Sequence, residues 1–236
     1  MKAVILAGGK GTRLRPFTTV VPKPLLPLKE RPILEHVILY LKQYGITDII
    51  ISIGYLGYQI KNYFGDGSQF GVHIEYVEEE KPLGTAGCLR PIKDRLTETF
   101  ILMGGDNITN LNLSNFIAFH REKQGIISVA LFEYSEPVPW GIYELNGDSS
   151  VKGFTEKPTF THKAGTMIFC LEPQIFEHIP EQADPANLTD HVIPALLKSG
   201  VKVFGYPFRD YWIDIGKLDD YYEMNGRKRG SRVFKS

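Results

Sequence analysis

The sequence contains little cysteine, no net charge and no long apolar run. Cys88 and Cys170 are the only cysteines, too few for a disulfide framework and wrongly spaced for a zinc site. We therefore expect reduced thiols and a cytoplasmic location. Lys+Arg and Asp+Glu are both 27, and this balance argues against a nucleic-acid partner. No stretch approaches the roughly 18 apolar residues of a membrane helix, so no membrane partner is expected.

The usual nucleotide-binding fingerprints are also missing. The pattern G-x-x-x-x-G-K-[ST] is absent, and Gly9-Lys10-Gly11 lacks the third glycine of G-x-G-x-x-G. Instead, an apolar run at 3–7 leads directly into glycines, whose backbone can approach a ligand closely and can form an anion-binding concavity. Arg13 and Lys23 add two cations, as polyphosphate binding requires. As a bare glycine loop, an ordinary strand-to-helix turn is an equal alternative.

Strand and helix signals alternate along the chain, which predicts βαβ units and a mainly parallel sheet in an α/β fold. The expected strands lie at 3–7, 48–53, 72–77, 100–103, 127–132, 141–145, 151–154, 166–171 and 201–206. The expected helices run from Pro32 to a C-cap at Gly45, and over 58–64, 173–179 and 190–198. Ligands in such sheets bind beyond the carboxyl ends of strands, where the glycine loop and Asp106 fall.

Gly8-Gly9-x-Gly11-Thr12-Arg13-Leu14-x-Pro16, followed by Pro22-Lys23-Pro24-Leu25, resembles the signature of the sugar-1-phosphate nucleotidyltransferases. Family-like segments at 83–87, 105–106, 156–158 and 212–221 extend the resemblance over nearly the whole chain. It implies a Rossmann-like, GT-A-like three-layer α/β/α fold with a mixed, mainly parallel sheet. The expected domain covers 1–225, with a nucleotide-binding half at about 1–110 and a sugar-phosphate-binding half at about 111–225. Residues 226–236 are expected to form a solvated basic tail.

The reaction implied by this resemblance joins a sugar-1-phosphate to the α-phosphate of a nucleoside triphosphate and releases pyrophosphate. The attacking oxygen is already ionised, so the task is to bring anions together and to stabilise charge, which calls for Mg²⁺ and fixed cations. The resemblance assigns catalysis to Arg13, Lys23 and Asp106. It assigns nucleotide binding to Leu6, Ala7, Gly8, Gly9, Gly11, Thr12, Arg13, Lys23, Glu79, Pro82 and Gly84.

Asp106 and Asp214 are the expected metal ligands. Asp106 follows an apolar strand and two glycines, and from spacing alone it could instead cap a turn. Asp214 lies among apolar neighbours in an expected buried strand, where a lone carboxylate is costly without a cation or hydrogen bonds; a helix N-cap is the alternative. In the resembling family, both positions bind Mg²⁺. Lys217 stands where that family usually has Thr.

The sugar phosphate is expected to contact Gly141, Glu156, Lys157 and Gly165, by resemblance alone. The glutamate would hold a sugar hydroxyl, the lysine would hold the phosphate, and from spacing alone Glu156-Lys157-Pro158 is a surface turn. The residue before Ala164-Gly165 is Lys163, where the family usually has Asn. This departure leaves the sugar open.

Residues 79–87, Glu-Glu-Lys-Pro-Leu-Gly-Thr-Ala-Gly, resemble the base-reading segment of mannose-1-phosphate guanylyltransferases most closely. One carboxylate can accept both the N1–H and the 2-amino group of guanine, whereas uracil and thymine offer only N3–H. Glu78 or Glu80 could take the role of Glu79, and the three glutamates could equally form a solvated loop.

The expected function is Mg²⁺-dependent nucleotidyl transfer from GTP to mannose-1-phosphate or a related sugar phosphate. A uridylyl-, thymidylyl- or cytidylyltransferase is the alternative within this chemistry. From another class, the chain could be a catalytically silent nucleotide-sugar-binding regulatory subunit, although such relatives would be expected to lose charged site residues, which are present here. The expected partners are the two substrates, and a homo-oligomer is possible.

Overall fold

The computed structural model describes residues 1–209, 211–216 and 218–226. The basic tail expected at 226–236 lies outside these residues apart from Gly226, and so does Lys217. Within the described part of the chain, no helix has the length and apolar character needed to cross a membrane.

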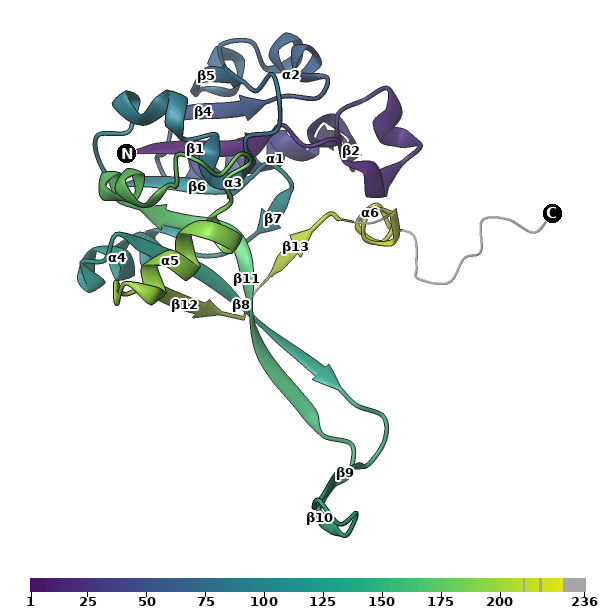
Figure 1. The fold of residues 1–236 in the computed structure, drawn as a ribbon. Helices are drawn as coiled ribbons and strands as arrows, with labels where there is room; N and C mark the ends of the chain where they lie inside the picture. The colour runs from purple at the N-terminus through teal and green to yellow at the C-terminus, as the bar shows by residue number, and fades with distance from the viewer. Residues whose placement is uncertain (210, 217, 227–236) are drawn as a thin grey trace, which may run out of the picture.

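A seven-stranded sheet with the order β12-β8-β11-β6-β1-β4-β5 forms the centre of the molecule (Figure 1). Its strands are β1 (Lys2–Ala7), β4 (Asp48–Ile53), β5 (His73–Glu78), β6 (Phe100–Gly104), β8 (Ile127–Pro137), β11 (Thr159–Leu171) and β12 (Phe204–Phe208). Smaller pairs are β2 (Pro27–Leu28) with β3 (Arg31–Pro32), β7 (Asn107–Thr109) with β13 (Trp212–Asp214), and β9 (Ile142–Leu145) with β10 (Val151–Thr155). The helices are α1 (Ile33–Gln43), α2 (Gly57–Phe64), α3 (Gly84–Gly87), α4 (Leu113–Lys123), α5 (Ile193–Lys198) and α6 (Leu218–Met224).

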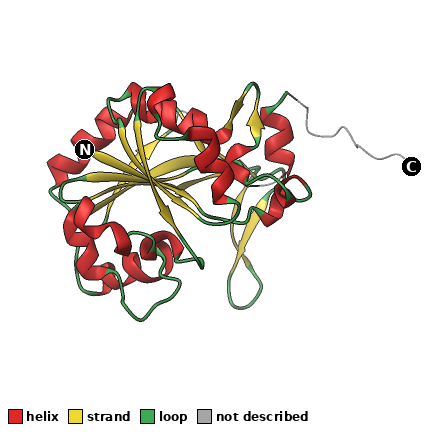
Figure 2. Ribbon diagram, turned by 90° about the horizontal axis from the view of Figure 1, so that it is seen from above, coloured by secondary structure: helices red, strands yellow, loops and turns green. Residues whose placement is uncertain are grey.

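The mixed, mainly parallel sheet expected from the sequence is confirmed. β1 pairs in parallel with β4 and β6, β4 with β5, and β8 with β12, whereas β11 runs antiparallel to both of its neighbours. Helices cover both faces of the sheet (Figure 2), as the three-layer prediction required. The carboxyl ends of β1, β4 and β6 meet at one edge, and this edge positions the candidate site.

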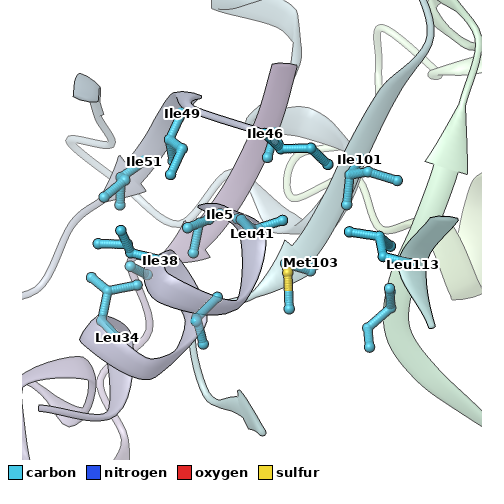
Figure 3. Close-up of a cluster of buried hydrophobic side chains, with 14 of the residues drawn as sticks. Ile5, Leu34, Ile38, Leu41, Ile46, Ile49, Ile51, Ile101, Met103 and Leu113 are labelled. Atoms are coloured by element: carbon cyan, nitrogen blue, oxygen red, sulfur yellow. The ribbon is translucent and has the colours of Figure 1, made fainter. Parts of the chain in front are cut away.

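Alternating side chains of the central strands fill two cores. Ile5 and Ile51 point to the face covered by α1, where they meet Leu34, Ile38 and Leu41 (Figure 3). Their neighbours Val4 and Ile50 point to the opposite face, together with buried residues of α3 and α5. Because both faces are buried, these strands read as nearly continuous apolar runs, which is why the sequence located them.

The second half differs from the prediction at several boundaries. β8 was predicted to end at residue 132 but continues to Pro137. β11 was predicted to begin at residue 166 but already begins at Thr159. The strand expected at 201–206 is β12, which begins at Phe204 and ends at Phe208. The expected helix at 173–179 is a 3₁₀ segment over Pro173–His178, and the one at 190–198 is a π turn followed by α5. The polar helix α4 has no counterpart in the prediction.

Both cysteines are buried and unpaired, as expected. Burial raises the pKa of the Cys88 thiol to about 12, with a smaller contribution from the charge of Glu79. Burial likewise raises the pKa of Cys170 to about 12. The thiolate is the reactive form, so neither residue is poised for nucleophilic chemistry.

Candidate functional site

The glycine turn after β1 lies close to neighbouring backbone. Gly8 O accepts a hydrogen bond from Tyr55 N at 3.2 Å, which ties the turn to the end of β4. Gly11 has φ +58°, and a Cβ there would lie 3.0 Å from Thr18 Cγ2 and 3.1 Å from Lys23 Cβ. Both the left-handed backbone and the space require glycine at position 11.

A pocket of about 690 Å³ opens at this edge of the sheet. It is lined by all eleven residues that the resemblance assigned to nucleotide binding, and also by Asp106. Its remaining lining comes from Lys10, Pro24, Gly54, Tyr55, Glu80, Lys81, Thr85, Gly104, Gly105 and Met167. Segments that are distant in sequence therefore form one concave surface that carries several cations, as a polyphosphate site requires.

Lys23 links the two expected metal ligands. Its Nζ forms an ion pair with Asp106 Oδ2 and lies 3.7 Å from Asp214 Oδ1. The Lys23 side chain is only 12% exposed, compared with 29% for Asp106 and 42% for Asp214. The structure thus brings the pair together, although Asp214 is half-buried rather than fully enclosed.

Strand pairing brings these carboxylates together across more than a hundred residues. β13 runs antiparallel to β7, with Asp214 opposite Asn107 and therefore beside Asp106. Trp212 Nε1 donates to Asn107 Oδ1 at 2.7 Å and fixes this register. A Cβ at Gly104 would lie 2.3 Å from Asn107 Nδ2 and 2.7 Å from Asp106 Oδ1, so a larger residue there would displace these two side chains.

The electrostatics of Asp214 reflect this crowding. Burial raises the pKa of Asp214 above its ordinary value and the nearby charge of Asp106 raises it further, while Lys23 and Arg13 act in the opposite direction. Arg13 lies on the Asp214 side, where a Cβ at Gly216 would be 3.1 Å from an Arg13 Nη atom. Two carboxylates that repel each other form a site that an added cation would stabilise.

Glu79 lies beneath the glycine turn with both carboxylate oxygens engaged. Oε1 accepts from Ser52 Oγ at 2.5 Å, and Oε2 accepts from Leu83 N at 2.9 Å. A Cβ on Gly8 would lie 3.1 Å from Oε1. Each oxygen has a second lone pair, so Glu79 can hold the loop and still accept a further donor from the pocket. Glu80 also lines the pocket, whereas Glu78 pairs with Lys61 outside it.

The loop that carries Gly84 is held by a segment from the second half of the chain. Ala86 N and Gly87 N both donate to Ala186 O, and Ala186 N donates to Leu83 O. Thr85 N donates to Asn187 Oδ1 at 3.2 Å. The spacing of residues within the loop contains no indication of these contacts, so the sequence did not predict them.

Replacing Gly84 with Ala should lower both the melting temperature and nucleotide affinity. Gly84 has φ +83°, and a Cβ would lie 2.4 Å from Ala186 O, so the loop must move or remain strained. Strain of this kind costs about 1–3 kcal/mol in the free energy of unfolding. Thermal unfolding and calorimetric titration with GTP measure the two effects. Gly147→Ala is the control because a Cβ there meets no atom within 4 Å; equal melting temperatures for the two variants would contradict this account.

The expected sugar-phosphate residues lie elsewhere. Gly141 directly precedes β9, and Glu156 and Lys157 directly follow β10, so the three lie where the β9–β10 hairpin joins the ribbon of β8 and β11 that projects from the body (Figure 1). A Cβ at Gly141 would lie 2.9 Å from Glu156 Oε2, and Lys157 Nζ is 3.9 Å from Glu156 Oε1. Gly165 lies in β11, two residues before Met167, which does line the pocket. None of the four is itself part of the pocket lining.

The pocket also contains residues that the sequence did not single out for the site. Gly54 and Tyr55 follow β4. Position 54 has no room for a side chain, because a Cβ there would lie 2.9 Å from Gly8 O. The sequence feature that could have identified this part of the pocket is a glycine directly after a buried strand. Among the described residues, no group of three or more His, Cys, Asp or Glu side chains could hold a metal alone.

Known proteins resemble this chain over nearly its full length. A model of the nucleotidyl transferase family matches residues 2–229. A mannose-1-phosphate guanylyltransferase from Mycobacterium tuberculosis is 36% identical over 93% of this chain, and a UTP–glucose-1-phosphate uridylyltransferase from Synechocystis is 32% identical over 94%. The chain spans about 62% of the length of each of these relatives.

Solved structures agree with these matches. A Bacillus anthracis protein, provisionally named a glucose-1-phosphate thymidylyltransferase, superposes with a TM-score of 0.77 at 29% identity, covering 95% of this chain and 94% of that one. HddC from Yersinia pseudotuberculosis, complexed with GMP-PN, has a TM-score of 0.73 at 25% identity, with 95% and 97% coverage. The chain belongs to the nucleotidyl transferase family, and its relatives are sugar-1-phosphate nucleotidyltransferases.

Proposed function

We propose that this chain transfers a nucleotidyl group from a nucleoside triphosphate to a sugar-1-phosphate and releases pyrophosphate. The observation that carries the proposal is the contact of Lys23 with both Asp106 and Asp214 beside the glycine turn. Phosphoryl chemistry needs anions positioned and charge neutralised rather than a covalent nucleophile. Arg13 and Lys23 would bind the triphosphate, and Lys157 would bind the sugar phosphate.

Asp106 and Asp214 would hold Mg²⁺. The pair fits this ion because Mg²⁺ is commonly bound by one or two carboxylates together with substrate phosphates, so a third protein ligand is not required. The raised pKa of Asp214 supports the same assignment, since an added cation would relieve the repulsion from Asp106. When bound, the ion would neutralise charge on the reacting phosphates.

GTP is the favoured triphosphate and mannose-1-phosphate, or a related sugar phosphate, the favoured acceptor. The proposal rests on the Glu79 carboxylate at the pocket wall, on the guanylyltransferase of M. tuberculosis and on the complex of HddC with GMP-PN. The similarity to a uridylyltransferase of Synechocystis supports the alternative nucleotide, UTP. Measuring pyrophosphate release for four triphosphates, each combined with several sugar-1-phosphates, distinguishes GTP from UTP as the preferred triphosphate and identifies the preferred acceptor.

Replacing Glu79 with Gln should lower kcat/KM for GTP by several-fold to about 10²-fold and should change use of UTP or dTTP much less. An amide keeps one acceptor but presents a donor where guanine also presents one, and mispaired polar groups in a partly dry site are costly. Steady-state kinetics with each triphosphate measure the difference.

The neighbouring glutamates distinguish a base contact from a general charge effect. Glu78→Gln is the control, because Glu78 pairs with Lys61 at 2.6 Å outside the pocket. A larger loss with GTP in Glu80→Gln would move the guanine contact to Glu80, which also lines the pocket. Wild-type protein that prefers UTP or dTTP would contradict the guanine assignment before any variant is made.

A further inference from the structure

An irregular segment from the second half of the chain packs on the loop that carries Gly84 (residues 79–87). Residues 180–187, here called the strap, lie between the 3₁₀ segment Pro173–His178 and the π turn Leu188–Val192 and run beside α3 (Figure 1). The structure describes the whole strap, and none of its residues lines the pocket. The loop does line it, through Glu79, Glu80, Lys81, Pro82, Gly84 and Thr85. The strap therefore supports one wall of the pocket from outside.

The strap and the loop are joined through their backbones. Ala86 N and Gly87 N donate to Ala186 O at 2.9 and 3.0 Å, and Ala186 N donates to Leu83 O at 2.9 Å. Ala186 is fully buried at this contact. Because buried backbone groups need partners, the loop and the strap can hold these positions only together.

One of these hydrogen bonds connects the strap to the Glu79 carboxylate through a single residue. The carbonyl oxygen of Leu83 accepts from Ala186 N, and the Leu83 amide donates to Glu79 Oε2 at 2.9 Å. The other carboxylate oxygen accepts from Ser52 Oγ, which belongs to β4. A shift of the strap would therefore move Leu83 and remove one of the two hydrogen bonds that orient the Glu79 carboxylate.

Arg90 binds the other end of the strap. Its Nη2 donates to Ala183 O at 2.8 Å and also to Pro180 O. Hydrogen bonds from a charged donor are roughly twice as strong as those between neutral groups. Arg90 Nε is buried and has no hydrogen-bond partner among the described residues. An unpaired buried donor is costly, so the contacts with the strap carbonyls are what keep this guanidinium in place.

A surface ion pair also joins the two segments. Lys81 Nζ contacts Asp184 Oδ2, with the two side chains 69% and 37% exposed. Exposed ion pairs contribute little to stability. The position of the strap therefore depends on Arg90 and on the backbone hydrogen bonds of Ala186 more than on this pair.

We propose that the strap is a positioning element of the triphosphate pocket and that Arg90, which does not line the pocket, is the residue that holds it in place. Arg90 acts on the nucleotide through the strap and Leu83, and it takes no part in the chemistry at Lys23 and Asp106. Its loss weakens triphosphate binding and base discrimination rather than turnover at saturation. This inference rests on the proposed function, because it uses Glu79 as the base contact.

Replacing Arg90 with Met should raise the KM for GTP by several-fold to about 10²-fold with little change in kcat, since a small misplacement caused far from the chemistry can have effects of this size. The ratio of kcat/KM for GTP to that for UTP should fall, and the KM for mannose-1-phosphate should stay the same. Arg90→Lys keeps a charged donor for the two carbonyls and should recover part of the loss.

Arg95→Met is the matched control for these kinetics. Arg95 lies on the same 3₁₀ segment as Arg90 but pairs with Glu75 at 3.0 Å, and neither residue lines the pocket. A fall in kcat with an unchanged KM for GTP in Arg90→Met would overturn the proposal, because it is the effect of losing folded protein. Kinetics equal to those of Arg95→Met would overturn it as well.

Hydrogen exchange of the wild-type protein provides a test that needs neither a variant nor catalysis. Coupling between two sites is reciprocal in binding free energy, so GTP should slow exchange of the Ala186 amide although the strap lies outside the pocket. Mass spectrometry of peptides covering 180–187, with GTP and with UTP, measures this protection, and peptides from α4 serve as the reference. No change in the strap at saturating triphosphate would overturn the proposal. Protection of the strap in a protein that releases no pyrophosphate with any sugar phosphate would support the role of the strap and contradict the proposed function.

Discussion

Replacing Asp106 with Asn should lower kcat by about 10²-fold or more while leaving the melting temperature nearly unchanged. Asn has nearly the shape of Asp but lacks the negative charge that contacts Lys23 and would bind the metal. Preorganised electrostatic contacts of this kind are worth about 10²–10³ in rate. The expected defect is catalytic because the side chain is part of the pocket lining rather than the apolar core.

Pyrophosphate release at saturating Mg²⁺ measures this effect, and Asp214→Asn should show a loss of the same kind. Asp94→Asn is the matched control, because Asp94 is an exposed aspartate in the 3₁₀ segment over Arg90–Arg95, away from the pocket. Near-normal turnover in both site variants would contradict the assignment of Asp106 and Asp214 as Mg²⁺ ligands. A large loss in Asp94→Asn would show that the assay reports a general change in charge or folding.

Replacing Lys23 with Ala should lower kcat/KM for the triphosphate by about 10²–10³-fold. Lys23 is the least exposed member of the charged trio and contacts both carboxylates. Its removal leaves Asp106 and Asp214 to repel each other, which raises the pKa of Asp214 further in the direction set by burial. Affinity for a divalent cation should therefore be retained or increased, although turnover falls.

Two measurements separate these consequences. Mn²⁺ binding, followed by electron paramagnetic resonance, should be at least as tight in Lys23→Ala as in wild type, and steady-state kinetics should show the loss in kcat/KM. Lys93→Ala, which removes an exposed lysine outside the pocket, should change neither quantity. Loss of Mn²⁺ binding together with activity would indicate that Lys23 shapes the carboxylate pair instead of neutralising the substrate.

The sequence predicted the central strands well because burial on both faces makes them apolar throughout. The prediction for β4 over 48–53 matches the structure residue for residue. By contrast, the polar helix α4 was missed, although Asn112 caps it by accepting from Asn115 N at 3.0 Å. The outer halves of β8 and β11 were missed for a related reason, since strands outside the core carry no apolar run.

The nucleotide side of the site was predicted through the resemblance to a family, and its long-range geometry was not accessible from spacing. Lys23 contacts Asp106 across 83 positions of the chain. Its second contact, with Asp214, also depends on the pairing of β7 with β13. The contacts of Ala186 and Asn187 with the loop that carries Gly84 depend equally on tertiary packing. Lys157 lies at the end of the long two-stranded ribbon of β8 and β11, and local sequence patterns do not determine this position.

The most direct test of the central claim follows the phosphorus atoms of the substrates. Wild-type protein incubated with GTP, mannose-1-phosphate and Mg²⁺ should give equal amounts of a nucleoside diphosphate sugar and pyrophosphate, which phosphorus NMR resolves. The Asp106→Asn variant should give neither on the same timescale. Wild-type protein that binds GTP by calorimetry yet forms neither product with any sugar phosphate, or that only hydrolyses the triphosphate, would contradict nucleotidyl transfer at this pocket.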